Sequence, residues 1–343
     1  MDITILMPCL NEEETLAQCI TKANKWIKEN PQWKAEVVIA DNGSTDKSID
    51  IAKSLGARVI NVAKKGMGAA LYQGSKEALG KWIIMGDSDD SYDFSKLSNF
   101  VEKLNQGYDL VVGNRFKGGI EKGAMPFLNH YLGNPVLTLI GKILFKCPIN
   151  DFHCGLRGIK KDSFLRLNIQ SKGMEYYTEM AIRASLLGMK ICEVPTTLSK
   201  DGRSRPPHLR PWSDGWKNLR FMLLYSPKYL FGVFGLLSLF LSFVFPTLQL
   251  TLISFFEVAI ALGLLVQTIG IKQGRFPSSK KVNFLIAHSE LLAILSLGIL
   301  LLSFCSLVIK INPIIEFILL TAGVLFFTFT ALLFFTLPKN DKN

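Results

Sequence analysis

The arrangement of apolar and polar residues divides the chain into two parts that meet near residue 228. Before that point, short apolar runs alternate with segments in which apolar residues recur at intervals of three and four. After it, four long apolar stretches follow one another with few charges. This contrast predicts a soluble domain followed by a membrane region.

The first part predicts an alternation of strands and helices, because short apolar runs are typical of buried strands and three-to-four spacing of helices. Strands are expected at 3–10, 35–46 (with a loop at its carboxyl end), 57–62, 81–87 and 111–116, and helices at 11–30, 48–56 and 66–80. This order indicates an α/β fold, a parallel sheet with helices on both faces, in which ligands bind beyond the carboxyl ends of the strands. Glu12, Glu13 and Glu14 are expected in the first turn of the 11–30 helix, where the helix dipole favours acids.

The second part predicts four transmembrane helices of roughly bilayer length. They are expected at 229–245, 248–270, 291–309 and 314–337. The loop at 272–281 contains four basic residues, and basic loops stay in the cytosol. We therefore expect a multi-pass membrane protein of the cell inner membrane or an equivalent membrane, with its soluble domain in the cytosol.

A basic, aromatic segment joins the two parts. Residues 211–228 predict an amphipathic helix that lies along the membrane interface. The basic residues between 200 and 228 are Lys200, Arg203, Arg205, Arg210, Lys217, Arg220 and Lys228, against Asp201 and Asp214 alone. The predicted organisation is thus a cytosolic domain at 1–210, an interfacial helix at 211–228 and four membrane helices within 229–338.

Composition narrows the classes of partner. The net charge of +11 suits anionic membrane lipids and phosphorylated substrates. No zinc finger, helix-turn-helix or aromatic-rich RNA motif is present, so nucleic acid is not an expected partner. The six cysteines are scattered without a CxxC pair, which indicates a reduced compartment and no disulfide framework.

A dense acidic cluster follows the predicted strand at 81–87. Asp87, Asp89 and Asp90 stand within four positions of one another. Mg²⁺ and Mn²⁺ prefer hard oxygen ligands and commonly bridge protein carboxylates to phosphates. Asp87 and Asp89 are therefore predicted to hold such a cation together with a diphosphate. A solvated acidic turn is the alternative interpretation.

Three other strand ends carry candidate ligand contacts. Asp41 could accept hydrogen bonds from a base or a ribose, and Lys65 precedes a glycine-rich helix start that suits a phosphate. Arg115 ends the strand at 111–116 and could clamp a phosphate. Taken alone, each of these segments is also an ordinary turn.

Five segments in register resemble the family 2 glycosyltransferases with the A-type nucleotide-diphospho-sugar fold. They are PCLNE, ADNGSTD, KKGMGAA, GDSDD and GNRF. The segments DFHCGLRGIKKD and DGRSRPPHLRPW, followed by apolar stretches, resemble the polyprenyl-phosphate glycosyltransferases, among them the dolichyl-phosphate mannose and glucose synthases. The resemblance covers roughly residues 3 to 228 and implies an A-type glycosyltransferase domain.

The resemblance also implies roles for individual residues. The nucleoside would be held by Pro8, Leu10, Asn11, Glu12 and Asp41, and the metal and ribose by Asp87, Ser88 and Asp89. Arg115 would clamp the diphosphate. Some relatives have a Gln as a further metal ligand two positions after the second Asp; here Ser91 stands there, which leaves Asp90 or water.

The implied reaction is a metal-dependent, inverting transfer of a hexose from a UDP- or GDP-linked donor to undecaprenyl or dolichyl phosphate. The acceptor phosphate is already anionic, so it needs no strong general base. Arg203 and Arg205 are expected to reach the phosphates, and His153 and Arg157 to line the acceptor pocket. For His153, a structural hydrogen bond is an equally good interpretation.

Two other functions stay open at this point. A processive polysaccharide synthase pairs a similar domain with membrane helices, although its usual QxxRW motif is absent here. A flippase or scaffold that only binds a nucleotide sugar is the non-enzymatic alternative. The sequence names neither the sugar nor the nucleotide, and it leaves a homo-oligomer open.

Overall fold

A computed structural model describes residues 1–204 and 211–226, together with scattered single positions and runs of two or three residues between 229 and 271. The chain divides into two units, Met1–Phe221 and Met222–Asn343. Within the described residues, no helix has both the length and the apolar character needed to cross a bilayer. The four predicted spans lie wholly or largely outside the described residues, so they stay a prediction.

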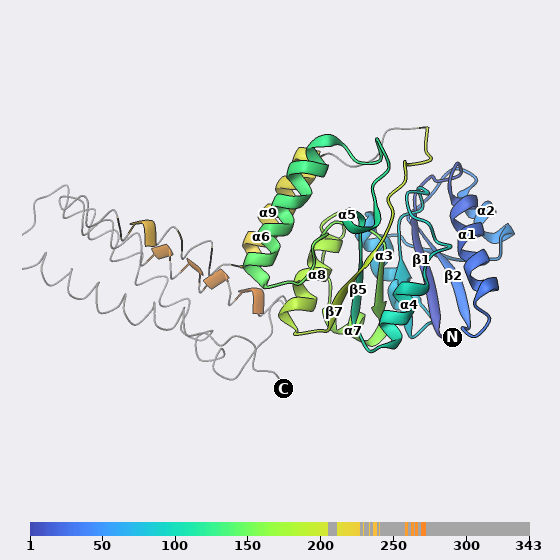
Figure 1. Ribbon diagram of the computed structural model, residues 1–343, viewed down its shortest axis with the longest axis horizontal. Helices are drawn as coiled ribbons and strands as arrows, with labels where there is room; N and C mark the ends of the chain where they lie inside the picture. Colours follow the sequence, from blue (N-terminus) through green and yellow to red (C-terminus); the bar gives the residue numbers. More distant parts are fainter. Residues whose placement is uncertain are drawn as a thin grey trace, which may run out of the picture. The chain divides into compact units, whose positions relative to one another are not determined.

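A mixed sheet of seven strands forms the centre of the first unit (Figure 1). The strands are β1 (Ile3–Cys9), β2 (Ala35–Asp41), β3 (Arg58–Asn61), β4 (Trp82–Met85), β5 (Leu110–Asn114), β6 (Arg157–Lys160) and β7 (Ile191–Pro195). Their order across the sheet is β3-β2-β1-β4-β6-β5-β7. All described pairs are parallel except those of β6, which runs antiparallel to β4 and β5. The α/β class is confirmed, but the expectation of an all-parallel sheet is wrong at β6.

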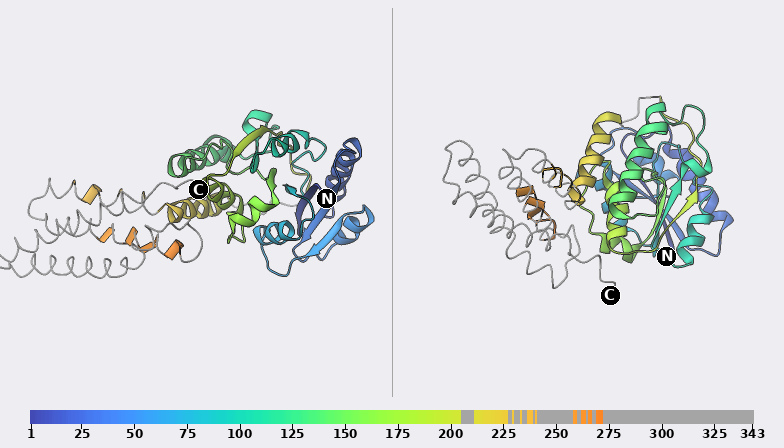
Figure 2. Two further views of the ribbon diagram at one scale, coloured as in Figure 1. Left: turned by 90° about the horizontal axis from the view of Figure 1, so that it is seen from below. Right: turned by 60° about the vertical axis from the view of Figure 1, so that its left-hand side comes forward.

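Helices cover both faces of this sheet, as Figure 1 and Figure 2 show. The helices are α1 (Leu16–Glu29), α2 (Ser48–Ser54), α3 (Met67–Glu77), α4 (Ser98–Asn105), α5 (Arg115–Gly118), the π-helix η1 (Asn129–Gly133), α6 (Asn134–Phe145), α7 (Lys161–Leu167), α8 (Tyr176–Leu186) and α9 (Pro211–Tyr225). Every residue of β4 and β5 is buried. A strand buried on both faces needs a layer on each side, which explains the apolar runs WIIM in β4 and LVV in β5.

The predicted helix at 11–30 begins later than expected. Helix α1 starts at Leu16 and buries its three-to-four spaced apolar residues, among them Leu16, Ile20 and Trp26. Glu12, Glu13 and Glu14 therefore precede the helix, and its first turn contains no acidic residue. The expected pairing of these carboxylates with the helix dipole is wrong. They lie instead in the loop after β1.

One edge of the sheet collects the loops that matter for ligand binding. The carboxyl ends of the parallel strands gather there, whereas antiparallel β6 contributes its first residue, Arg157. This residue pairs with Met85 of β4 on one side and with Val112 of β5 on the other. The segment before β6 is thereby delivered to the same edge as the loops that follow β4 and β5.

Candidate active site

The acidic loop after β4 is fixed by hydrogen bonds to the neighbouring chain. The Ser88 hydroxyl donates to the carbonyl of Pro8 at 2.6 Å, and the Thr15 hydroxyl donates to the carbonyl of Ser88 at 2.7 Å. Ser88 is buried, and the half-buried residues Asp87 and Asp89 flank it. The loop therefore presents two carboxylates from a rigid support at the ligand edge of the sheet.

Asp87 lies in a confined environment. The Tyr177 hydroxyl, from α8, lies 3.4 Å from Asp87 Oδ1. A Cβ atom added to Gly155 would lie 2.4 Å from Asp87 Oδ2, so only glycine leaves room for this carboxylate. Burial, together with the nearby charge of Asp89, raises the pKa of Asp87 to about 7. A buried carboxylate whose ionisation is opposed by a neighbouring carboxylate marks a site that favours a cation.

Asp89 pairs with Arg203, a residue 114 positions further along the chain. Arg203 Nη2 lies 2.8 Å from Asp89 Oδ2, and Arg203 Nη1 lies 3.1 Å from Glu12 Oε1. The same guanidinium also pairs with Asp201. The other Asp89 oxygen accepts from the amide and the hydroxyl of Ser91 at 3.1 and 2.6 Å. Arg203 thus joins three carboxylates at the rim of the acidic loop.

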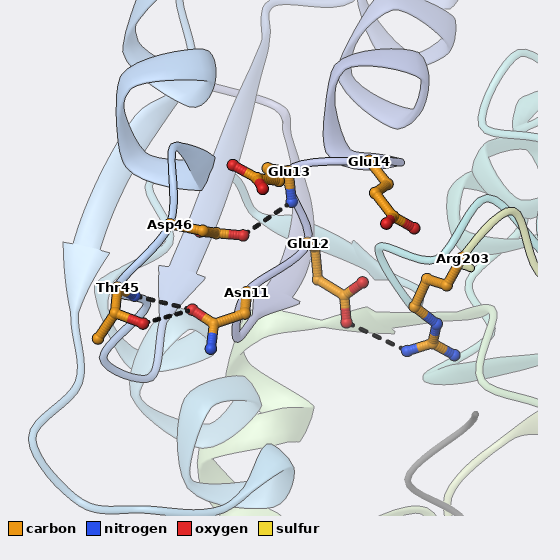
Figure 3. A pocket seen from close by; sticks show the side chains of 7 residues that line it. All are labelled: Asn11, Glu12, Glu13, Glu14, Thr45, Asp46 and Arg203. Carbon is orange, nitrogen blue, oxygen red and sulfur yellow. Dashed lines mark hydrogen bonds and ion pairs between the residues drawn. The ribbon is translucent and has the colours of Figure 1, made fainter. Parts of the chain in front are cut away.

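A pocket of about 320 Å³ opens beside this ion-pair cluster (Figure 3). It is lined by Asn11, Glu12, Glu13, Glu14, Thr45, Asp46 and Arg203. Asn11 has a left-handed backbone with φ of 58°. Its Oδ1 accepts from the amide of Thr45 at 2.7 Å, which ties the loop after β1 to the loop after β2. The pocket therefore lies where two strand ends meet the Arg203 segment.

The residues predicted to hold the nucleoside and its phosphates shape the neighbouring loops. Asp41 is buried, and its carboxylate accepts from the amides of Gly43 and Ser44 at 2.9 and 3.2 Å. Lys65 donates from Nζ to the carbonyl of Asn42 at 2.7 Å. Leu10 is partly exposed at the end of β1. Asp41 and Lys65 thus fix the loop after β2, which borders the pocket.

Arg115 forms a buried ion pair with Asp151. Its Nε and Nη2 each lie 2.7 Å from a carboxylate oxygen of Asp151, and its backbone amide donates to Oδ2 at 3.0 Å. Asp151 has no exposed surface. Burial alone would raise the pKa of Asp151, but Arg115 lowers it below its usual range. The predicted phosphate clamp therefore has two of its donors directed at a carboxylate of its own protein.

His153 lies in the loop before β6, two residues after Asp151. Both of its ring nitrogens are buried and lack a hydrogen-bond partner within the described residues. Burial, with the nearby charges of Arg115 and Arg157, lowers the pKa of His153 to about 4. The ring is thus neutral at physiological pH.

Arg157 differs from what the sequence led us to expect. It has no exposed surface and donates to the carbonyls of Cys154, Tyr177 and Phe152, and its guanidinium lies 4.8 Å from the centre of the Tyr177 ring. A guanidinium held in this way supports Tyr177, whose hydroxyl lies beside Asp87. Its burial and its three carbonyl partners give Arg157 a structural role in this structure, and its predicted place beside the acceptor stays a prediction.

Asp90 was a candidate for the third metal ligand, and the structure engages it elsewhere. Its backbone is left-handed, with φ of 64°, and its Oδ1 lies 2.6 Å from Lys22 Nζ on α1. Among the described residues, no three His, Cys, Asp or Glu side chains converge as a metal site. Arg205 lies outside the described residues.

Comparison with known proteins places this site in a family. The family model described as "Glycosyl transferase family 2" matches residues 4–167. The glycosyltransferase AglJ of Haloferax volcanii is 30% identical over 69% of this chain and 77% of its own length. The chain belongs to glycosyl transferase family 2.

Two further relatives from Haloferax volcanii have more specific names. The low-salt glycan biosynthesis hexosyltransferase Agl6 is 37% identical over 68% of this chain, but the match spans only 56% of Agl6. A dolichyl-phosphate hexose transferase is 29% identical over 62% of this chain and 89% of its own length. A crystal structure of a mycobacterial protein superposes with a TM-score of 0.52, at 19% identity, over 65% of this chain and 74% of its own. At that identity the likeness supports the fold alone.

In this family 2 glycosyltransferase, several site residues have no clear signal in the sequence. Asp151 stands in a segment that the resemblance singled out, but nothing in the local pattern pairs it with Arg115, 36 positions away. Tyr177 and Asp201 likewise contact the acidic loop, directly or through Arg203, only because the fold brings them there. Gly155 had a weak signal, since a glycine next to a buried strand often marks a close approach.

Proposed function

We propose that this glycosyltransferase moves a hexose from a nucleotide-diphospho-sugar to a polyprenyl phosphate at the cytosolic face of a membrane, with inversion of the anomeric centre. The observation that carries the proposal is the joint presence of Asp87, Asp89 and Arg203 at one edge of the sheet. The names of two relatives, a hexosyltransferase and a dolichyl-phosphate hexose transferase, support the transferred group and the acceptor class.

The residues present fit a divalent cation that also binds the donor. Asp87 and Asp89 are hard oxygen donors, and burial together with the charge of Asp89 raises the pKa of Asp87. Because two protein carboxylates leave positions for phosphate oxygens and water, they suit Mg²⁺ or Mn²⁺, which keep such ligands. When bound, the cation would neutralise charge on the donor diphosphate.

The chain's own residues then have separate tasks. Asp87 and Asp89 would hold the cation to which the diphosphate binds, and Ser88 keeps both carboxylates in place through its bond to Pro8. Arg203, already beside the pocket, would offer positive charge to the departing diphosphate. An acceptor phosphate oxygen forms the new bond to the anomeric carbon as the bond to the nucleoside diphosphate breaks, so no proton transfer is required.

Arg115 acts on the acidic loop at a distance, through its charge. Its bidentate pair with Asp151 fixes a positive charge near Asp87, and this charge favours the ionised carboxylate. Arg115 therefore supports the metal site electrostatically.

A transfer assay on the full chain tests the proposal. Radiolabelled UDP- and GDP-hexoses are supplied with a short polyprenyl phosphate and Mg²⁺ or Mn²⁺, and label is measured in the organic phase. We expect lipid-linked label that disappears with a chelator and with Asp89→Asn. Asp93→Asn is the matched control, because Asp93 belongs to the same acidic stretch but bonds Ser95. Label in water-soluble polymer would instead indicate a synthase, and the absence of any transfer would contradict the proposal.

A further inference from the structure

Glu193 lies on β7, the strand at one edge of the sheet, beside β5 (Figure 1). Its side chain is only 6% exposed, and its carboxylate accepts four hydrogen bonds. Asn114 Nδ2 and Asn150 Nδ2 donate to Oε2 at 3.0 and 2.8 Å. The backbone amides of Asn150 and Asp151 donate to Oε1 at 2.6 and 3.0 Å. One carboxylate of an edge strand therefore joins the end of β5 to the loop before β6.

The two segments that Glu193 joins contain the buried ion pair of Arg115 and Asp151. Asn114 directly precedes Arg115, and Asp151 is itself one of the donors. Asn114 is fully buried, and its Oδ1 accepts from the amide of Lys117 at 2.9 Å, so both ends of its side-chain amide are fixed. Glu193 thus bonds Asp151 directly and reaches Arg115 through Asn114.

The register of the sheet directs Glu193 toward this pair. Glu193 pairs with Val112 of β5, and Asn114 lies two positions further along that strand. Paired residues of neighbouring strands, and residues two apart in one strand, point to the same face of the sheet. The Glu193 side chain is long enough to span the step from Val112 to Asn114. A shorter acid would keep the charge and lose this reach.

Ion pairing alone does not account for the burial of Glu193. Its cationic partner within the described part of the chain is Lys117, whose Nζ lies 3.9 Å from Oε2 and whose side chain is 59% exposed. Such a pair contributes little to stability. The four close donors are all uncharged amide groups, and a buried carboxylate needs these donors because each unmet hydrogen bond costs free energy. The position of Glu193, more than its charge, therefore determines its role.

The loop that Glu193 fixes also reaches the acidic loop. Asp151 begins a segment that continues to Gly155, and a Cβ on Gly155 would lie 2.4 Å from Asp87 Oδ2. Gly155 in turn donates its amide to the Tyr92 hydroxyl at 2.9 Å. A shift of the loop at Asp151 would therefore be passed to the surroundings of Asp87 within four residues.

We infer that Glu193 is a positioning residue of the active site, which keeps Arg115, Asp151 and the loop beside Asp87 in place. The inference rests on the proposed function in one respect, the assignment of Asp87 as a metal ligand. It adds a residue of the edge strand that has no contact with the acidic loop of its own among the bonds described above. Its influence on the cation site is expected to pass through Asp151.

Glu193→Asp tests the inference on the full chain, because it keeps the charge and withdraws the carboxylate by one methylene group. Lys117→Met is the charge control, since it removes the cation beside Glu193 and leaves the four hydrogen bonds in place. Glu36→Asp is the matched control for stability. Glu36 of β2 also accepts several hydrogen bonds, from Thr4 and Leu79 among others, but it lies at the end of its strand away from the ligand edge.

Two measurements are made on each variant, hydrogen exchange at the Arg115 amide and Mn²⁺ affinity by electron paramagnetic resonance titration. The Arg115 amide donates to Asp151 at 3.0 Å, so its exchange reports on the buried pair itself. In Glu193→Asp this amide should exchange about tenfold faster, because the pair opens locally more often. Mn²⁺ affinity should fall about tenfold, as it does when a residue that supports a metal ligand is changed. Both controls should match the parent protein.

Several outcomes would overturn the inference. Unchanged exchange at Arg115, or faster exchange with unchanged Mn²⁺ affinity, would confine Glu193 to the local fold. An equal loss of Mn²⁺ affinity in Glu36→Asp would trace the effect to stability, and an equal loss in Lys117→Met would trace it to charge.

A second variant keeps the test decisive if Glu193→Asp does not fold. Glu193→Gln keeps the length of the side chain but replaces one acceptor by a donor, and it should change both measurements in the same direction. Neither measurement involves transfer. A protein that binds Mn²⁺ but transfers no hexose would therefore refute the proposed function and leave the test of Glu193 intact.

Discussion

Arg203 neutralises Asp89 across 114 positions of sequence, with Nη2 and Oδ2 2.8 Å apart. The same side chain serves Glu12 and Asp201 and is only 11% exposed. The guanidinium therefore supplies the positive charge beside Asp89 that a bound cation would also supply. Cation and arginine are expected to compete for Asp89.

The first prediction concerns this competition. Arg203→Met removes the cation that Glu12, Asp89 and Asp201 share and should lower the free energy of unfolding by about 3 kcal/mol, the cost of removing one partner from a buried pair. Added Mn²⁺ should raise the melting temperature of this variant more than that of the parent protein. Lys22→Met, which removes the partner of Asp90, is the control and should leave the Mn²⁺ response unchanged. An equal Mn²⁺ response in the Arg203 variant would refute the competition.

The second prediction concerns the space beside Asp87. Gly155→Ala places a Cβ at 2.4 Å from Asp87 Oδ2, so the carboxylate must move. Displacing a metal ligand through its neighbour should weaken Mn²⁺ binding by about tenfold, as measured by electron paramagnetic resonance titration. Gly215→Ala is the control, because its Cβ would meet nothing within 4 Å. Unchanged Mn²⁺ affinity in the Gly155 variant would show that Asp87 is not a ligand.

The third prediction concerns the buried pair of Arg115 and Asp151. Asp151→Asn leaves the guanidinium without its counter-charge and should cost about 3 kcal/mol in the free energy of unfolding, measured with urea. Glu29→Gln interrupts the ion pair with Lys25, in which both side chains are more than half exposed. That control should change stability by less than about 1 kcal/mol. Similar losses in the two variants would contradict the burial assigned to Asp151.

The fourth prediction concerns pH. The folded protein keeps the pKa of His153 at about 4, whereas the unfolded chain has the ordinary value of 6.5. Between these values the unfolded chain binds the extra proton, so His153 makes the protein less stable as the pH falls from 6.5 to 4. The loss approaches about 3 kcal/mol at the lower limit.

Comparing the parent protein with His153→Leu isolates this effect. The difference in the free energy of unfolding between the two should shift in favour of the variant as the pH falls through this range, and it should be constant above pH 7. A difference that stays constant from pH 4 to 7 would show that the His153 ring is accessible to protons in the folded protein.

The sequence predicted the elements whose pattern is local. Strand β4 is an uninterrupted apolar run, β1 is apolar apart from Thr4, and α1 repeats its apolar residues at helical spacing, so both types of element were found. Strand β6 was missed because its four residues, RGIK, include two charges and a glycine. Its strand conformation comes from pairing with β4 and β5 on both sides, and local propensity does not contain that information.

In the candidate site, too, the residues with a local sequence signal were predicted and those that only the fold brings together were not. Asp87 and Asp89 were identified because the density of acids is visible in the sequence. The identity of their neighbours was not, since Arg203, Tyr177 and Gly155 reach the acidic loop only through the folded chain. Arg157 was assigned to the acceptor because of its charge. A fully buried arginine that binds carbonyl groups cannot be distinguished from an exposed one by spacing alone.

The reversed direction of β6 makes the active site sensitive to small changes in chain length. Successive residues of a strand face opposite sides of the sheet. Deleting one residue between Asp151 and Arg157 would therefore turn each β6 side chain to the opposite face of the sheet. Arg157 would leave its three carbonyl partners, and Gly155 would no longer stand beside Asp87. Homologous enzymes that keep the acidic pair should therefore tolerate substitutions in this segment more readily than insertions or deletions.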